Sequence, residues 1–194
     1  MDCSKAFDMG CFSTLFSKIL MKDMPAVVVR TLIYVYEQQY AWVTWGKAKS
    51  DLFPIVNGTR QGSVLSPALF AVYMDEILVN LRKLGVGCFV AGVFMGAFGY
   101  CDDLALLAPS RPAMQLMLRA CETFGTKNNL IFSTDTDPVK FKTKCVYFSG
   151  KKKKIDKPAP LSLYCRELPW VSSATHIGHL LSEEGTMDKD IREK

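Results

Sequence analysis

The stretch Phe98-Gly99-Tyr100-Cys101-Asp102-Asp103-Leu104-Ala105-Leu106-Leu107 places two adjacent carboxylates between two apolar runs. Apolar and aromatic runs on both sides of a short polar break are typical of a hairpin, because each run can form a strand and the break can turn. We therefore expect a β-hairpin with Asp102 and Asp103 at its tip. Two carboxylates held together at a turn repel each other unless a cation lies between them. Taken alone, however, an Asp-Asp pair in a turn is more often simply solvated.

Two helices are predicted on either side of this hairpin. Ser66-Pro67 provides a hydroxyl that can cap free amides and a proline at the first helical position. An apolar stripe at helical spacing follows it, formed by Leu69, Phe70, Tyr73, Ile77 and Leu81. Residues 112–125 carry a second inward stripe, formed by Met114, Met117, Leu118, Cys121 and Phe124.

The remaining segments continue the alternation of helices and strands. Residues 11–22 and 25–40 favour two further helices, and residues 41–56 favour a hairpin with its tip at 46–50. Residues 85–108 predict strands, followed by short strands over 144–149, 161–164 and 168–171 and a helical tail from Met187. This order indicates an α+β fold, with helices packed on one face of an antiparallel sheet.

Composition limits the class of protein. At 194 residues and 49% hydrophobic content, the chain can bury one good core but is short for two full domains. No apolar run approaches the roughly 20 residues that span a bilayer, and no leader pattern opens the sequence. We therefore expect an intracellular chain with no membrane partner, the nucleus being one candidate compartment. The seven cysteines include no C-x-x-C pair, which favours reduced thiols.

The net charge of +5 is concentrated in one stretch. The lysines gather over residues 140–157, at Lys140, Lys142, Lys144, 151–154 and Lys157. Such a cluster suits a polyanionic partner, because each neutralised phosphate releases condensed counterions. The alternative is a solvated lysine loop with no partner.

Five segments, in sequence order, carry a more specific signal. They are Asp2-Cys3-Ser4-Lys5-Ala6-Phe7-Asp8, Asn57-Gly58-Thr59-Arg60-Gln61-Gly62-Ser63-Val64-Leu65-Ser66-Pro67, the Phe98 to Asp103 box, Lys142-Thr143-Lys144, and His176-Ile177-Gly178-His179-Leu180. Together they resemble the five catalytic motifs of reverse transcriptases from non-LTR retrotransposons, the last two being the weaker matches. The resemblance covers nearly the whole chain.

The resemblance implies a polymerase palm with an antiparallel ferredoxin-like sheet, and RNA-templated DNA synthesis by two-metal nucleotidyl transfer. It implies that Asp2 and Asp102 ligate two Mg²⁺ ions, or Mn²⁺, while Asp103 supports the site. Carboxylates suit this task, because phosphoryl transfer needs hard oxygen ligands for Mg²⁺. Two ions about 4 Å apart activate the 3′-hydroxyl and stabilise the leaving pyrophosphate.

The resemblance also assigns substrate contacts in the first three motifs. Cys3 would offer its backbone carbonyl, and Phe7 would be a steric gate that favours deoxynucleotides, although a core phenylalanine is the simpler interpretation. Gln61 and Gly62 match the nucleotide and template contact, where glycine lets the backbone approach a base pair closely. Arg60 would reach phosphate unless it is an ordinary surface arginine. Tyr100 is the aromatic residue that precedes the carboxylate pair.

The last two motifs imply a general acid and a primer contact. Either Lys142 or Lys144 would protonate the leaving pyrophosphate, and the sequence does not choose between them. Ile177 and Gly178 would hold the primer through their backbone. We accordingly divide the chain into a palm core, residues 1–150, and a basic loop with a primer-grip segment near the thumb, residues 151–194.

The expected partners are an RNA template, a DNA primer and deoxynucleoside triphosphates. Fingers, thumb and endonuclease regions of a larger retroelement protein are expected outside this chain. The strand that should lead into Asp2 is reduced to Met1. Two alternatives remain at this stage: an inactive palm remnant that binds nucleic acid weakly, and a zinc module built from Cys145, Cys165, His176 and His179.

Overall fold

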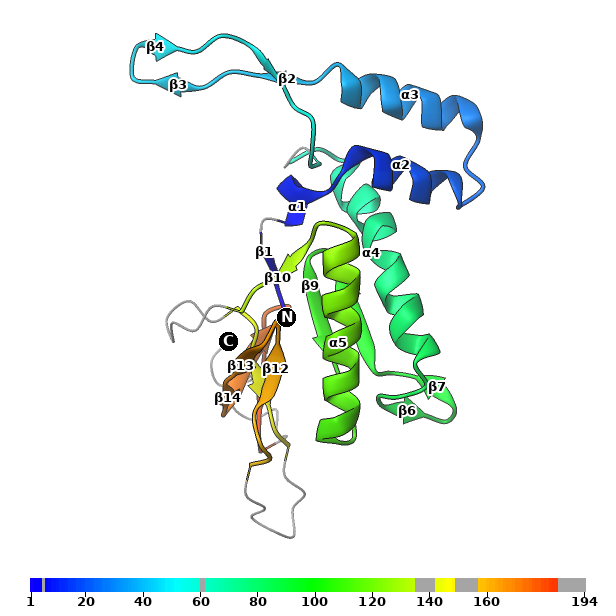
Figure 1. Ribbon diagram of the computed structural model, residues 1–194, viewed down its shortest axis with the longest axis vertical. Helices are drawn as coiled ribbons and strands as arrows, with labels where there is room; N and C mark the ends of the chain where they lie inside the picture. The colour runs from blue at the N-terminus through cyan, green and yellow to red at the C-terminus, as the bar shows by residue number, and fades with distance from the viewer. Residues whose placement is uncertain (5, 60–61, 135–141, 149–156, 185–194) are drawn as a thin grey trace.

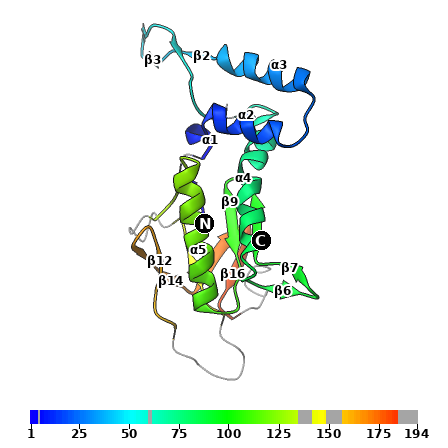
Figure 2. The same cartoon turned by 45° about the vertical axis from the view of Figure 1, so that its right-hand side comes forward.

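The computed structural model describes residues 1–4, 6–59, 62–134, 142–148 and 157–184. Figure 1 shows an elongated molecule whose body contains α4 (Ser66–Lys83) and α5 (Arg111–Lys127). The helices α1 (Ala6–Met9), α2 (Phe12–Leu20) and α3 (Ala26–Glu37) lie toward one end. In Figures 1 and 2, α4 and α5 run side by side along the hairpin of β8 (Ala97–Tyr100) and β9 (Asp103–Leu106).

The two long helices follow the predicted stripes. Leu69, Phe70, Tyr73, Ile77 and Leu81 of α4 are buried, and so are Met117, Leu118, Cys121 and Phe124 of α5. Ser110 caps α5, because its hydroxyl oxygen accepts a hydrogen bond from the Ala113 amide at 3.4 Å. The predicted cap by Ser66 is wrong: Leu65 takes the cap position, and Ser66 is already inside the first turn and buried.

The helices predicted over 11–22 and 25–40 are also present, as α2 and α3, and both are shorter than predicted. Because the chain turns at Asp23 with a φ of 55°, α2 and α3 are separate helices. The second of them ends at Glu37, so Tyr40 belongs to a strand and not to the predicted helix. Here β2 (Tyr40–Ala41) pairs with β5 (Phe53–Pro54), and β3 (Thr44–Trp45) pairs with β4 (Ala48–Lys49), which confirms the predicted hairpin.

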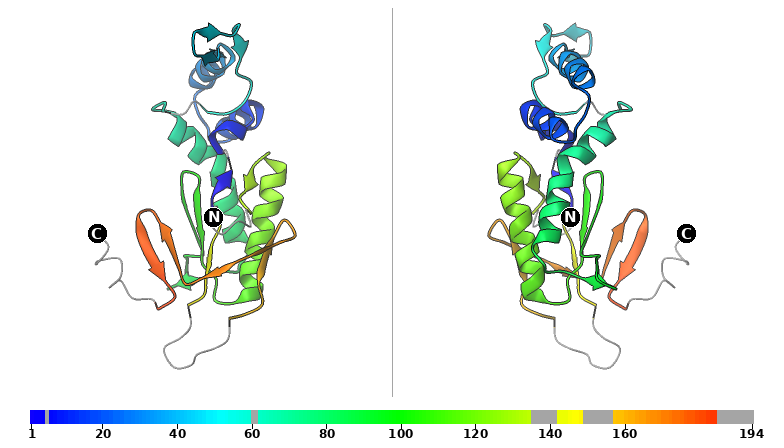
Figure 3. Two further views of the ribbon diagram at one scale, coloured as in Figure 1. Left: turned by 90° about the vertical axis from the view of Figure 1, so that its left-hand side faces the viewer. Right: turned by 90° about the vertical axis from the view of Figure 1, so that its right-hand side faces the viewer.

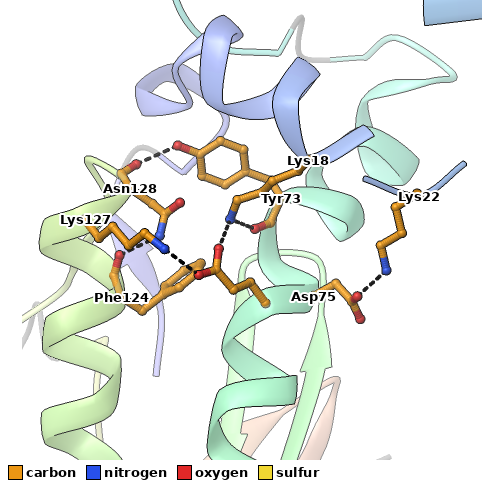
Figure 4. A network of polar contacts seen from close by, with 8 residues as sticks. Lys18, Lys22, Tyr73, Asp75, Phe124, Lys127 and Asn128 are labelled. Atoms are coloured by element: carbon orange, nitrogen blue, oxygen red, sulfur yellow. Dashed lines mark hydrogen bonds and ion pairs between the residues drawn. The ribbon is translucent and has the colours of Figure 1, made fainter. Parts of the chain in front are cut away.

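Polar contacts join α2 to the body (Figure 4). Lys18 of α2 and Lys127 of α5 each place their ammonium nitrogen 2.9 Å from a carboxylate oxygen of Glu76 on α4. Lys18 also donates to the Tyr73 carbonyl at 2.8 Å, and the Tyr73 hydroxyl donates to the Asn128 carbonyl at 2.6 Å. Three helices therefore meet at one carboxylate.

The hairpin predicted around the carboxylate pair is present. Strands β8 and β9 are antiparallel, with Tyr100 opposite Asp103, so Cys101 and Asp102 form the turn. Of the two carboxylates predicted at the tip, only Asp102 lies in the turn, because Asp103 is already the first residue of β9. Cys101 has a φ of 51°, in the left-handed region that tight hairpin turns require. A second hairpin precedes it, formed by β6 (Phe89–Val90) and β7 (Val93–Phe94).

The N-terminal residues lie between two strand pairs. Strand β1 (Cys3–Ser4) pairs antiparallel with β10 (Ile131–Phe132), while Asp2 forms an antiparallel bridge with Asp103. The Met1 amino group donates to the Leu104 carbonyl at 2.7 Å, and the Leu104 amide donates to the Met1 carbonyl at 2.9 Å. The first residues thus connect the β8–β9 hairpin to β10.

The C-terminal part consists of three more strand pairs. Strand β11 (Cys145–Val146) is parallel to β14 (Trp170–Val171), β12 (Leu161–Leu163) pairs with β13 (Arg166–Leu168), and β15 (Ser173–His176) pairs with β16 (His179–Ser182). The predicted strand 168–171 is divided because Pro169, which has no amide hydrogen, interrupts it. The predicted tail helix from Met187 lies outside the described residues.

The fold is therefore a mixed α+β structure, as predicted. Its described strands form pairs, and a continuous ferredoxin-like sheet is not seen among them. None of the helices in the described ranges combines the length and the apolar character needed to cross a membrane.

Candidate active site

The backbone brings two of the three predicted aspartates together. Asp2 and Asp103 are opposite each other in their antiparallel bridge, although about 100 residues separate them in the chain. Asp102 lies in the β8–β9 turn, directly before Asp103 at the start of β9, and its charge acts on the Cys3 thiol beside Asp2. All three side chains are half-buried.

The Asp2 carboxylate has an unusual environment. Its Oδ2 atom is buried and has no hydrogen-bond partner, yet the Lys142 ammonium nitrogen lies 3.1 Å away, at ion-pair distance. The contact therefore rests on charge and not on a well-directed hydrogen bond. The side chain of Lys142 is 61% exposed, so most of it remains in water. Lys144 is also exposed.

Cys3 follows Asp2 in the chain and belongs to the core beneath the aspartates. Its side chain is buried in the core, and burial raises the pKa of its thiol to about 12, with the nearby Asp2 and Asp102 carboxylates adding to the effect. The thiol is therefore neutral at physiological pH and acts as a small apolar side chain.

The predicted substrate residues fall into three groups. Tyr100 is the last residue of β8, beside the turn, and is 64% exposed. Gly62 has a φ of 81°, where a side chain would be strained. Ile177 and Gly178 form the turn of the β15–β16 hairpin, both at positive φ. Phe7 lies in α1, but its side chain is outside the described part of the structure, as are Arg60 and Gln61.

A cavity that the sequence did not reveal lies next to the aspartates. Its volume is about 380 Å³. One part of its wall is polar, with Asp103, Lys142 and Thr143, and much of the remainder is apolar, including Trp170 and Leu181. The Thr143 hydroxyl is buried without a hydrogen-bond partner. No local sequence pattern predicts this cavity, because its wall is formed by segments that lie far apart in the chain.

The donor chemistry of the aspartates fits a divalent cation. Carboxylates are the hard oxygen ligands that Mg²⁺ prefers, and Oδ2 of Asp2 is a buried acceptor whose charge is paired with the Lys142 ammonium group. Within the described ranges, however, no three His, Cys, Asp or Glu side chains converge as a ready ligand set. Cys145, Cys165, His176 and His179, the candidate zinc ligands, are all described and do not form such a group either.

Comparison with known proteins defines the class to which this site belongs. A family model described as "Reverse transcriptase (RNA-dependent DNA polymerase)" matches residues 1–154. The chain belongs to this reverse transcriptase family, whose members are RNA-dependent DNA polymerases.

Two relatives narrow the comparison to retrotransposons. The chain is 30% identical over 155 residues to the retrovirus-related Pol polyprotein from type-1 retrotransposable element R2 of Nasonia vitripennis, a match covering 80% of this chain and 15% of the relative. It is 30% identical over 118 residues to the Pol polyprotein from type-2 retrotransposable element R2DM of Drosophila melanogaster, covering 61% and 11%. The chain thus spans a small part of both relatives.

Proposed function

We propose that this chain is the palm of a larger retroelement protein and performs RNA-templated DNA synthesis by two-metal nucleotidyl transfer. The observation that carries the proposal is the bridge of Asp2 with Asp103, beside Asp102, with the buried Oδ2 of Asp2 paired to the Lys142 ammonium group. A buried carboxylate requires a positive charge beside it, and because Lys142 is largely exposed, its ammonium group can move into water and leave this place to a divalent cation.

Asp2, Asp102 and Asp103 would hold Mg²⁺ or Mn²⁺. When bound, the ions supply charge neutralisation for the triphosphate and lower the pKa of the attacking 3′-hydroxyl. The aspartates orient the reacting groups from both sides of the turn: Asp2 from the N-terminal segment, and the other two from the β8–β9 hairpin.

Lys142 is our choice for the general acid. Its ammonium nitrogen lies 3.1 Å from Asp2 and its side chain is largely in water, so it can reach a phosphate at the same site. As the general acid, Lys142 would donate a proton from Nζ to the leaving pyrophosphate. The backbone of Ile177 and Gly178 would then hold the primer end.

The remaining parts of the assignment are proposals of the same kind. They include a ferredoxin-like sheet with helices on one face, a palm core over residues 1–150, a primer-grip segment over 151–194, and an intracellular location. RNA template, DNA primer and deoxynucleoside triphosphates would be the substrates, with Phe7, Arg60, Gln61, Gly62 and Tyr100 around them. Fingers, thumb and an endonuclease would be supplied by the larger protein.

Primer extension on an RNA template tests the function. The wild-type chain should incorporate deoxynucleotides with Mg²⁺ or Mn²⁺ and stop when the cation is chelated. Asp102→Asn should lower the rate by about a hundredfold or more, because a neutral amide is a poor ligand for either ion. Asp23→Asn, on the turn between α2 and α3, is the matched control and should keep the wild-type rate.

The rival function is an inactive palm that only binds nucleic acid. One observation favours it: the three carboxylates are not assembled as a ligand cluster in this structure. Equal incorporation by wild type and Asp102→Asn, or none by either, would rule out catalysis at these aspartates in this chain.

A further inference from the structure

The segment between α3 and residue 55 exposes an unusual concentration of aromatic side chains. We call residues 40–54 the aromatic arm; it contains β2, β3, β4 and β5. Trp45 is 85% exposed, and Tyr40, Trp42 and Phe53 are each exposed by 44% or more. A large group of exposed apolar side chains on a protein surface often marks a binding site.

The arm is held in a defined shape. Its strand pairs place Tyr40 opposite Pro54 and Trp45 opposite Ala48. The Ser50 amide donates to the Val43 carbonyl, and the Val43 amide donates to the Ser50 hydroxyl, each at 2.9 Å. The rings are therefore presented on a folded hairpin, which lowers the entropy cost of binding.

Cationic groups accompany the rings. The ammonium nitrogen of Lys49 lies 3.7 Å from the centre of the Trp42 ring, a cation–π contact. Lys47 is exposed in the turn between β3 and β4. Asp51 is the single carboxylate of the arm, so the tip from Trp45 to Lys49 carries positive charge alone. Aromatic faces beside ammonium groups are the combination that binds unpaired bases and their phosphates.

The position of the arm agrees with such a ligand. The turn of the β8–β9 hairpin, which carries Asp102, points toward the end of the molecule where the arm and α3 lie (Figure 3). After β5, the chain continues within a few residues to Asn57, which bridges with Cys11, and then to Gly62. A nucleic-acid strand that passes over the β8–β9 turn can thus continue toward the aromatic arm.

We propose that the aromatic arm binds single-stranded nucleic acid, with Trp45 stacking on a base and Lys47 and Lys49 contacting phosphates. The inference rests on the proposed function, because it takes the ligand to be the nucleic acid of that same reaction. The charge at the tip favours this occupant over a second copy of the chain, whose own arm carries the same positive charge.

Binding of a labelled single-stranded RNA or DNA oligonucleotide tests the stacking contact. Fluorescence anisotropy of the oligonucleotide gives the affinity, and quenching of tryptophan emission reports whether a base reaches the ring. Trp45→Ala should weaken binding about tenfold, and Trp45→Phe should restore most of it, because a phenyl ring still stacks. A duplex of the same sequence should bind Trp45→Ala and the wild type equally.

The phosphate contacts have their own readout. In Lys47→Gln/Lys49→Gln, the slope of log affinity against log salt should become shallower by about 1.4, or roughly 0.7 for each lost phosphate contact with a single strand. The matched control is Arg82→Gln/Lys83→Gln, which removes two exposed charges from the last turn of α4 at the far end of the body. It should leave the slope unchanged.

The outcomes separate this inference from the proposed function. Unchanged affinity and unchanged quenching in Trp45→Ala would overturn the arm as a binding surface. A shift of the sedimentation coefficient in Trp45→Ala, with unchanged oligonucleotide binding, would assign the arm to contacts between copies and overturn it equally. If binding depends on Trp45 while primer extension fails in the wild type and in every variant, the arm is confirmed as a binding surface and the proposed function is wrong.

Discussion

Lys142 and Lys144 lie two residues apart, and their surroundings differ. Lys142 has its ammonium group at the Asp2 carboxylate, and Thr143 between the two lysines is buried, which fixes the backbone there. The chain bends at residue 143, before β11 begins at Cys145, so the regular alternation of a strand does not apply to these two lysines.

A pair of single substitutions distinguishes them. Lys142→Ala should slow primer extension roughly a hundredfold, which is the contribution of a positioned general acid, whereas Lys144→Ala should cost no more than a few-fold. The pH dependence of the rate provides a readout that mere misfolding would not change. Loss of the alkaline limb in Lys142→Ala would identify its proton; the opposite ranking of the two variants would transfer the role to Lys144.

At the scale of elements, Glu76 joins three helices. Hydrogen bonds from Lys127 and Lys18 lower the pKa of the Glu76 carboxyl, and burial of Lys18 lowers the pKa of that ammonium group. A carboxyl whose pKa is lower in the folded state stabilises the fold at pH values above its ordinary value near 4.5. That contribution disappears as the pH falls through the lower, folded pKa.

Glu76→Gln should therefore destabilise the protein by about 1 kcal/mol at pH 7, because the pair is partly screened by water. The difference between variant and wild type should shrink as the pH is lowered below 4.5. Urea unfolding at pH 7, 5 and 3.5 measures both effects. A difference that stays constant over this range would show that the charge of Glu76 is not the cause. Glu37→Gln, at the exposed end of α3, is the control.

Several elements could be predicted from local pattern alone. The stripes of α4 and α5 and the β8–β9 hairpin are encoded by residues close together in the chain, so periodicity was sufficient. The ends of elements were less predictable: Tyr40 lies in a strand and not in the predicted helix, and Pro169 divides a predicted strand. Capping by Ser66 failed because that serine is buried in the first turn of α4.

At the scale of the whole molecule, the pairing of Asp2 with Asp103 depends on backbone contacts across the chain. Motif resemblance suggested that these aspartates share a site, but no local pattern could show that Met1 exchanges hydrogen bonds with Leu104. The adjacent cavity was unpredictable for the same reason. The roles of the individual site residues remain predictions, and membership of the reverse transcriptase family is confirmed.

The buried core of α4 and α5 is expected to dominate stability. Ile77 is fully buried, so Ile77→Ala should lower the free energy of unfolding by about 3 kcal/mol, through lost burial and the cavity left behind. Leu116→Ala, at a half-exposed position of α5, should cost less than about 1 kcal/mol. Chemical denaturation monitored by circular dichroism gives both values. Similar losses in the two variants would contradict a core located between these helices.

The location of Met1 and Asp2 between β9 and β10 has a consequence for synthesis on the ribosome. The partners of these residues are made more than a hundred peptide bonds later, so the nascent segment must wait while α4, the hairpin and α5 emerge. Such long-range closure is slow, because the loop entropy is lost before the contact is gained. The bridge between Asp2 and Asp103 is therefore expected to form late in folding, after the elements that it joins.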